Sequence, residues 1–380
     1  MQPLIGLMLL SLLMVLWLTP HKVVWAQDLG GFNLPNLRLT AEAAVLIEGS
    51  TGQVLWAKNA YQRRPPASTT KILTTLVALE RGNQEDPVIM GASVQKAGGR
   101  TLGLRPGQVY PLGELIEAAL IYSANDACVA IGEHFGEEGI LFLQWMNQKA
   151  LTLGAYHTTY YNFNGMPHKN HRSCAFDLGI MARYALNHPE FARVVKSQFA
   201  TITPHAATDN KPGYTYSIKN TNALLWSYPG ADGVKTGTTQ AAGACLVASA
   251  TREKRQLVAV VLKSGNRFGE AARLLDFGFN HFTLVGQALP GEVVGLVPVA
   301  CGEVASIEVV VEENMGITVP VSQMEQIETR IVLDKPITAP VPAGTRVGEI
   351  VLMHQGRVLQ RSPLLSGQAV APAEPLWKIW

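Results

Sequence analysis

The sequence predicts an α/β domain, in which helices flank an antiparallel sheet, followed by a small all-β domain. Residues 43–58 contain two apolar segments joined by a Ser-Thr-Gly-Gln turn, as in a β-hairpin. Residues 233–263 predict an antiparallel meander, and helical periodicity fills much of the stretch between them. This order places both ends of the first domain in one sheet. Beyond about residue 284, short valine-rich segments alternate with proline and glycine, which is typical of all-β structure.

Helices are expected wherever apolar residues recur with a spacing of three and four. The first is the clearest, because Ile72, Leu73, Leu76 and Val77 form one apolar face and Gly82 ends the pattern. The full set comprises residues 67–81, 112–121, 126–135, 138–152, 174–187 and 269–279.

The chain divides into a leader (1–26), an α/β domain (37–283), a β-domain (284–370) and a tail (371–380). The leader resembles a secretory signal peptide that is cut after Ala26, since an apolar run is followed by a proline and by small residues. No Lys or Arg precedes the run, and an uncleaved anchor is the alternative. Either way, the body of the protein is expected outside the cytoplasm.

Charge and cysteine content exclude several classes of function. A formal net charge of +2 gives no strong field for nucleic acid, so none is expected as a partner. The four cysteines are too few and too dispersed for a disulfide scaffold, and their pairing stays open. None lies near clustered histidines, and no phosphate-binding glycine loop occurs, so neither a metal nor a cofactor is expected. The cysteines are Cys128, Cys174, Cys245 and Cys301.

Three short motifs carry the chemistry, in the order S-x-x-K, S-x-N and K-T-G. Each alone is weak, because residues 93–96 also fit the first pattern and residues 264–266 the second. Residues 93–96 precede Ala-Gly-Gly, which cannot continue a helix, and residues 264–266 fall after K-T-G, outside the order. The retained residues are Ser68 and Lys71, Ser123 and Asn125, and Lys235, Thr236, Gly237 and Thr238.

These residue types suit nucleophilic catalysis by serine. Ser68 begins the first helix, so Lys71 lies one turn further on the same side. A serine hydroxyl is a poor nucleophile until a neighbouring base takes its proton, and a partly desolvated lysine can serve as that base. Ser123 and Asn125 lie in a break between two helices, which presents a hydroxyl and an amide to a cleft. Gly237 lets a substrate backbone approach its strand closely.

The motif order is the signature of penicillin-binding proteins and serine β-lactamases. The sequence around the motifs resembles the low-molecular-mass D-alanyl-D-alanine carboxypeptidases over residues 37–282, including the segments Pro-Ala-Ser-Thr-Thr-Lys and Gly-Val-Lys-Thr-Gly-Thr-Thr. The resemblance implies a penicillin-binding/β-lactamase-like fold for the catalytic domain. It also implies peptidoglycan stem peptides ending in D-Ala-D-Ala as substrates, and β-lactam antibiotics as inhibitors.

The resemblance also implies residue roles. Ser68 would attack the carbonyl between the two D-alanines, with Lys71 as base and Ser123 as proton relay to the leaving D-alanine. Asn125 would hold the substrate amide, and backbone N–H groups of Ser68 and Thr238 would form the oxyanion hole. The substrate carboxylate would face a group of cationic and hydroxyl side chains, namely Lys235, Thr236, Thr238 and, at the position of the family's arginine, Arg267.

Some features remain open at this level. A serine β-lactamase, or a non-catalytic wall-binding protein of the same fold, is the alternative function. His168 and His171 are interpreted as solvated loop residues, and residues 162–167 as a loop beside the cleft. In the tail, Pro372 and Pro375 break any amphipathic helix; a frayed end is favoured, and weak contact of its two tryptophans with a membrane surface is the alternative.

Overall fold

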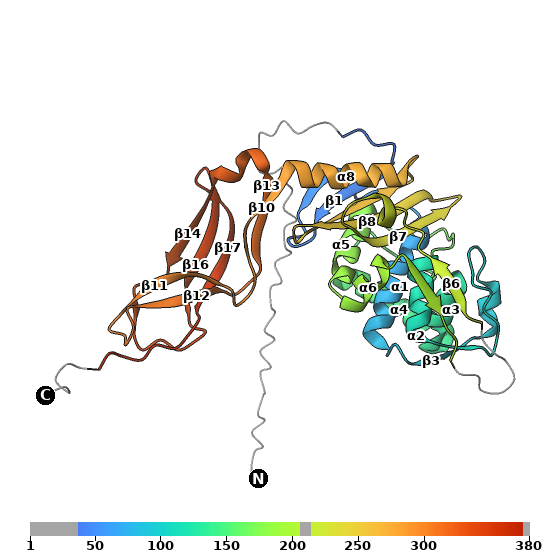
Figure 1. Cartoon of the computed structure of the whole chain (residues 1–380), viewed down its shortest axis with the longest axis horizontal. Coiled ribbons are helices and arrows are strands. Elements are labelled where there is room, and N and C mark those ends of the chain that lie inside the picture. Colours follow the sequence, from blue (N-terminus) through green and yellow to red (C-terminus); the bar gives the residue numbers. More distant parts are fainter. Residues whose placement is uncertain (1–36, 206–213, 375–380) are drawn as a thin grey trace, which may run out of the picture.

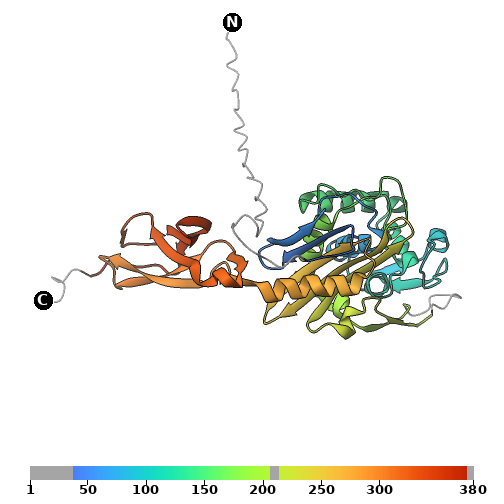
Figure 2. The same cartoon turned by 90° about the horizontal axis from the view of Figure 1, so that it is seen from above.

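The computed structural model describes residues 37–205 and 214–374. The predicted signal peptide (1–26) and the end of the tail (375–380) lie outside these residues. An α/β part and a β-rich part stand side by side, and α8 leads from one to the other (Figures 1 and 2). The predicted fold class is confirmed.

A five-stranded antiparallel sheet of order β2-β1-β9-β8-β7 forms the centre of the α/β part. Strand β1 pairs with β9 over its whole length, so the two ends of this part share one sheet, as predicted. The strands are β1 (Ala43–Glu48), β2 (Val54–Lys58), β7 (Ala231–Thr239), β8 (Gly243–Arg252) and β9 (Arg255–Leu262). Strand β7, which carries the K-T-G motif, lies at the edge.

The two faces of this sheet bury separate cores, because side chains alternate along a strand. In β9, Val258 and Val260 belong to the larger core, whereas Leu257, Ala259 and Val261 belong to a smaller core with residues of α8. The sequences of such strands are continuous runs of apolar residues because both faces of the sheet are covered.

The helices predicted from apolar periodicity are present in the α/β part, which also contains elements that were not predicted. A 3₁₀ turn (Ala67–Thr70) precedes α1, and a π-helical turn (Ala118–Tyr122) follows α2. Helix α6 and two small hairpins, β3–β4 and β5–β6, were not predicted. The bounds are α1 (Lys71–Arg81), α2 (Leu112–Glu117), α3 (Asn125–His134), α4 (Ile140–Thr152), α5 (Ala175–Leu186), α6 (Pro189–Lys196), α7 (Leu224–Ser227), α8 (Arg267–His281), β3 (Pro87–Ile89), β4 (Val109–Pro111), β5 (Phe199–Ile202) and β6 (Tyr216–Lys219).

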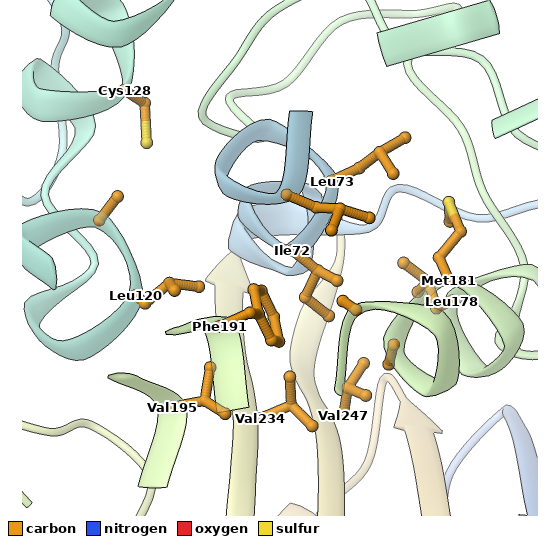
Figure 3. Packing of buried hydrophobic residues seen from close by; sticks show 14 of the residues in the cluster. Ile72, Leu73, Leu120, Cys128, Leu178, Met181, Phe191, Val195, Val234 and Val247 are labelled. Carbon is orange, nitrogen blue, oxygen red and sulfur yellow. The ribbon is translucent and has the colours of Figure 1, made fainter. Parts of the chain in front are cut away.

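Helix α1 lies in the centre of the larger core, which fixes the position of the residues at its N-terminus. Ile72 points toward Phe191 of α6 and toward Val234 and Val247 of the sheet (Figure 3). Burying such side chains contributes about 1.5–3 kcal/mol each. The serine and lysine of the first motif are therefore attached to a rigid element.

The β-rich part has a core of its own. Its strands form a sheet of order β14-β16-β17-β12-β11-β15 and a two-stranded pair, β10 with β13. The bounds are β10 (Phe282–Ala288), β11 (Val293–Ala300), β12 (Ser306–Val311), β13 (Met315–Pro320), β14 (Ile327–Leu333), β15 (Ile337–Thr338), β16 (Arg346–His354) and β17 (Arg357–Ser366).

Buried polar contacts join the two parts. Gln53 Nε2 donates to the carbonyl oxygen of Thr318, and Thr318 N–H donates to Gln53 Oε1, both at 2.9 Å. Arg255 pairs with Glu48 and donates to the carbonyl oxygen of Phe282 at 2.6 Å. These contacts order the junction. Within the described ranges, no helix combines the length and apolar character needed to cross a bilayer.

Candidate active site

The three motifs meet at one pocket of about 190 Å³ beside the edge strand β7. The nucleophile turn, the break between two helices and β7 each contribute to its wall. The lining residues are Ser68, Gly99, Arg100, Ser123, Asn125, Asn164, Gly165, Met166, Thr221, Thr236, Gly237, Thr238, Thr239 and Arg267. Segments separated by more than 160 residues in the chain thus converge on one site.

Lys71 lies directly beneath the serine. Its Nζ is 2.9 Å from Ser68 Oγ, 2.7 Å from Asn125 Oδ1 and 2.7 Å from the carbonyl oxygen of Asn164. The two carbonyl oxygens can only accept hydrogen bonds. A neutral amine therefore spends both of its N–H bonds on them, and its lone pair is left for the Ser68 hydroxyl. This arrangement orients the amine as a base toward the serine.

Burial also adjusts the basicity of this lysine. Lys71 is fully buried, and desolvation lowers its pKa to about 8. Its closest partners are neutral carbonyl groups rather than carboxylates, so the charged form gains little compensation. A substantial fraction of the amine is then unprotonated near neutral pH.

The second motif forms a sharp turn that faces the same pocket. Ser123 has left-handed backbone angles (φ 70°, ψ 32°), ends the π-helical turn and lines the pocket. Asn125 begins α3, and its amide is bonded at both ends: Oδ1 accepts from Lys71, and Nδ2 donates to the carbonyl oxygen of Gly98 at 2.8 Å. Asn125 thereby connects the lysine to the 98–100 loop.

The third motif forms the opposite wall. A Cβ atom on Gly237 would lie 3.0 Å from Ser68 N, so β7 approaches the nucleophile turn as closely as glycine allows. Thr236 Oγ1 is 2.6 Å from Thr221 Oγ1, and Arg267 Nη1 donates to Thr238 Oγ1 at 2.7 Å. Hydroxyl groups and a guanidinium therefore gather at this end of the pocket.

Lys235 is placed differently from its neighbours. It is buried, its Nζ donates to the carbonyl oxygen of Thr236 at 3.2 Å, and it lies behind the wall rather than on it. Desolvation, above all, lowers its pKa well below the ordinary value.

The 162–167 segment is indeed a loop beside the pocket. Asn164, Gly165 and Met166 line it, and Gly165 has a positive φ of 86°. A Cβ atom on Gly165 would lie 1.9 Å from the carbonyl oxygen of Ala67, a distance that no side chain tolerates. Glycine is required here because the loop packs directly on the backbone before Ser68.

The interpretation of His171 as a solvated residue was wrong, whereas His168 is exposed. His171 Nδ1 accepts from Tyr161 N–H at 3.1 Å, so Nε2 carries the proton and donates to Thr70 Oγ1 at 2.8 Å. Thr70 in turn donates to the carbonyl oxygen of Ala67. Desolvation lowers the pKa of His171 to about 4, so the ring is neutral near pH 7. Sequence context could not reveal that this polar loop folds inward.

The rejected motif matches lie outside the pocket. Ser93 donates to the Glu133 carboxylate, and Lys96 is exposed. Ser264 donates to Glu270 at 2.6 Å. Cys128 and Cys245 are buried, as predicted, and all four cysteines are unpaired.

A separate group at the start of α5 brings potential metal ligands within 4.8 Å of one another, namely His157, Cys174 and Asp177. The Cys174 sulfur accepts the N–H of Asp177, and the carboxylate of Asp177 accepts from Thr158. These bonds cap the helix, and none of the three residues lines the pocket.

The pocket residues that were not singled out from the sequence include Arg100 and Thr221. Neither belongs to a motif. Each reaches the pocket through a backbone bond to a distant segment: Asn125 N–H donates to the carbonyl oxygen of Arg100, and Thr221 N–H to that of Ile121. Local sequence carries no signal for such contacts.

Comparison with known proteins gives a consistent result. The family model for D-alanyl-D-alanine carboxypeptidases (peptidase S11) matches residues 32–266, and that for the C-terminal domain of penicillin-binding protein 5 matches residues 282–372. D-alanyl-D-alanine carboxypeptidase DacF of Bacillus subtilis (strain 168) is 33% identical over 352 residues, which cover 90% of this chain and 89% of the relative.

Further relatives have the same description. D-alanyl-D-alanine carboxypeptidase DacD of Escherichia coli (strain K12) is 30% identical, with 86% of each chain covered. The crystal structure of penicillin-binding protein 5 from Haemophilus influenzae superposes with a TM-score of 0.74 at 27% identity, covering 90% of this chain and all of the other. The chain therefore belongs to the D-alanyl-D-alanine carboxypeptidase family of serine peptidases, S11.

Proposed function

We propose that this protein removes the terminal D-alanine from peptidoglycan stem peptides that end in D-Ala-D-Ala, through an acyl-enzyme on Ser68. The observation that carries the proposal is the contact between Lys71 Nζ and Ser68 Oγ at 2.9 Å, with the other two directions of the amine taken by carbonyl oxygens. A hydroxyl and an oriented base within hydrogen-bond reach are what nucleophilic catalysis needs.

In the proposed reaction, Lys71 takes the Ser68 proton as the oxygen attacks the carbonyl between the two D-alanines. The N–H groups of Ser68 and Thr238 stabilise the oxyanion, each contributing about 3 kcal/mol. The C–N bond then breaks, and Ser123 passes to the leaving amine the proton that Lys71 had taken up, which returns Lys71 to its neutral form. Water attacks the ester in the second half of the reaction, which releases the shortened peptide and restores the Ser68 hydroxyl.

The ends of the substrate are assigned to opposite walls of the pocket. The carboxylate of the leaving D-alanine faces Thr236, Thr238 and Arg267, with Lys235 acting through the wall. Asn125 lies on the acyl side. A β-lactam presents a carboxylate and a strained amide with the same spacing as the peptide, so it acylates Ser68 as well. The substrate requires a site on the cell-wall side of the membrane, to which the protein is exported.

Mass spectrometry of the penicillin-treated protein tests the proposal. The adduct is expected on Ser68, and purified enzyme is expected to release D-alanine from a diacyl-L-Lys-D-Ala-D-Ala peptide. Ser68→Ala should abolish both, whereas Ser93→Ala, which removes the serine of the rejected motif, should not. Label without D-alanine release would favour a non-catalytic wall-binding protein. Rapid repeated turnover of nitrocefin would favour a β-lactamase.

A further inference from the structure

Arg100 is a cation on the pocket wall that the proposed reaction does not use. Its guanidinium carbon lies 5.0 Å from the ring centroid of Tyr122, the residue before Ser123. Its carbonyl oxygen accepts from Asn125 N–H at 2.7 Å, and Asn125 Nδ2 holds Gly98. The arginine is therefore stacked and tied at its backbone, which lowers the entropy cost of binding a ligand.

The carboxylate that follows Asn125 in the chain anchors this loop instead of pairing with Arg100. Asp126 is buried, and its two oxygens accept from the N–H groups of Leu102, Gly103 and Leu104 at 2.9–3.1 Å. Among the residues that the structure describes, no acidic side chain forms an ion pair with Arg100. The guanidinium thus lies over an aromatic ring, at a pocket, without an anion.

The pocket has one such cation on each wall. Arg267 is bonded to Thr238 on the β7 wall, where the carboxylate of the leaving group is assigned. Arg100 belongs to the wall of Asn125, on the acyl side. Both charges are close enough to Lys235 to oppose its protonation, after the larger effect of burial. Two cations on opposite walls repel each other. A substrate that places one anion beside each arginine would neutralise both charges and remove this repulsion.

We propose that Arg100 forms a subsite for a carboxylate on the acyl part of the substrate, on the side chain of the residue that precedes the two D-alanines. This inference rests on the proposed function, because it takes the D-Ala-D-Ala carboxylate to occupy the opposite wall. Bidentate binding of a carboxylate suits the planar guanidinium, and stacking on Tyr122 leaves its outer edge free for such a contact. Arg100 is then a specificity-determining residue.

Matched peptides test the subsite. Acetyl-X-D-Ala-D-Ala is prepared with X as L-glutamate or L-glutamine, and with a side chain two methylenes longer in its carboxylate and carboxamide forms. D-Alanine release gives kcat/KM for each. At low ionic strength, the carboxylate form of at least one pair should be preferred about fivefold, as expected for a partly exposed ion pair. In Arg100→Gln, the ratio within that pair should fall to about one.

Arg105→Gln is the matched control, since Arg105 is an exposed arginine of the same segment that stacks on Tyr214, away from the pocket lining. It should keep the fivefold ratio. Two results would overturn the subsite: an unchanged kcat/KM ratio in Arg100→Gln, or no preference for the carboxylate peptide in the unaltered enzyme. Arg100 would then serve only to pack against Tyr122. No D-alanine release from any of the peptides would instead overturn the proposed function.

Discussion

The protonation state of Lys71 predicts how acylation depends on pH. With a pKa of about 8, the neutral amine makes up roughly 1% of the population at pH 6, about 10% at pH 7 and about 90% at pH 9. The ordinary value of 10.5 would leave only about 0.03% neutral at pH 7. Burial therefore raises the population of the active base about 300-fold, equivalent to about 3 kcal/mol.

The measurement is the second-order rate constant for acylation by a fluorescent penicillin between pH 6 and 10, at constant ionic strength. The rate should rise about 100-fold from pH 6 and level off above pH 9, with its midpoint near 8. A flat profile would refute the assignment of Lys71 as base. So would a midpoint near 10, since the buried position would then not have lowered the pKa.

Asn125→Asp links that midpoint to Lys71 itself. It places a carboxylate oxygen where Asn125 Oδ1 now lies, 2.7 Å from Nζ, and an opposite charge at that distance raises a lysine pKa by about 1–3 units. The rate at pH 7 should fall at least about tenfold and recover as the pH approaches 10. Loss of the Nδ2 bond to Gly98 would lower the rate equally at every pH, so the two effects are separable. An unshifted midpoint would show that another group titrates.

Three further predictions concern the surroundings of the site. Gly165→Ala should reduce the acylation rate by orders of magnitude, because the added Cβ collides with the carbonyl oxygen of Ala67, just before the nucleophile. Gly103 has a similar positive φ but no neighbour within 4 Å, so Gly103→Ala should keep the rate. Equal losses in the two variants would contradict this reasoning. His171→Ala should lower the free energy of unfolding by about 1–3 kcal/mol and slow acylation, because the buried hydroxyl of Thr70 and the N–H of Tyr161 each lose a bond. His168→Ala should change neither quantity. Urea denaturation and the rate of penicillin labelling are the measurements. Gln53→Ala leaves the N–H and carbonyl groups of Thr318 without their partners at the junction of the two parts. The free energy of unfolding is expected to fall by about 1–3 kcal/mol in urea denaturation. An unchanged midpoint would count against a stabilising role of the junction.

Regular elements and motif residues were predictable because their signals are local. Apolar spacing around Ile72 identified α1, and the meander predicted at 233–263 corresponds to strands β7, β8 and β9. The S-x-x-K match at 68–71 could be separated from that at 93–96 because only the former opens a long apolar helix. Conversely, α6 was missed although Pro189 marks its start, because its eight residues span little more than two turns, too few for a clear helical period.

The parts that could not be predicted depend on contacts between distant segments. His171 lies in a polar stretch, and its burial depends on the nucleophile turn about 100 residues earlier accepting its ring proton. Lys235 belongs to the K-T-G motif, yet its side chain is buried and its Nζ donates to the carbonyl oxygen of Thr236, which the motif alone did not indicate. Arg100 is distinguished from Arg105 by its place over Tyr122 and by the bond from Asn125. In each case the deciding partner is remote in sequence.

Two adjacent residues beside Lys71 have different tasks: Asn125 contacts the lysine, and Asp126 anchors the 102–104 segment. Asn125 and Asp126 follow each other at the start of α3, but only the neutral amide touches the lysine. The carboxylate is directed to three backbone N–H groups, where it secures the 102–104 segment. Exchanging these environments would place a full negative charge against Nζ, raise the pKa of Lys71 and remove the neutral amine at pH 7. A base made from a buried lysine thus requires carbonyl partners, and the nearby acid contributes only if its charge is satisfied elsewhere.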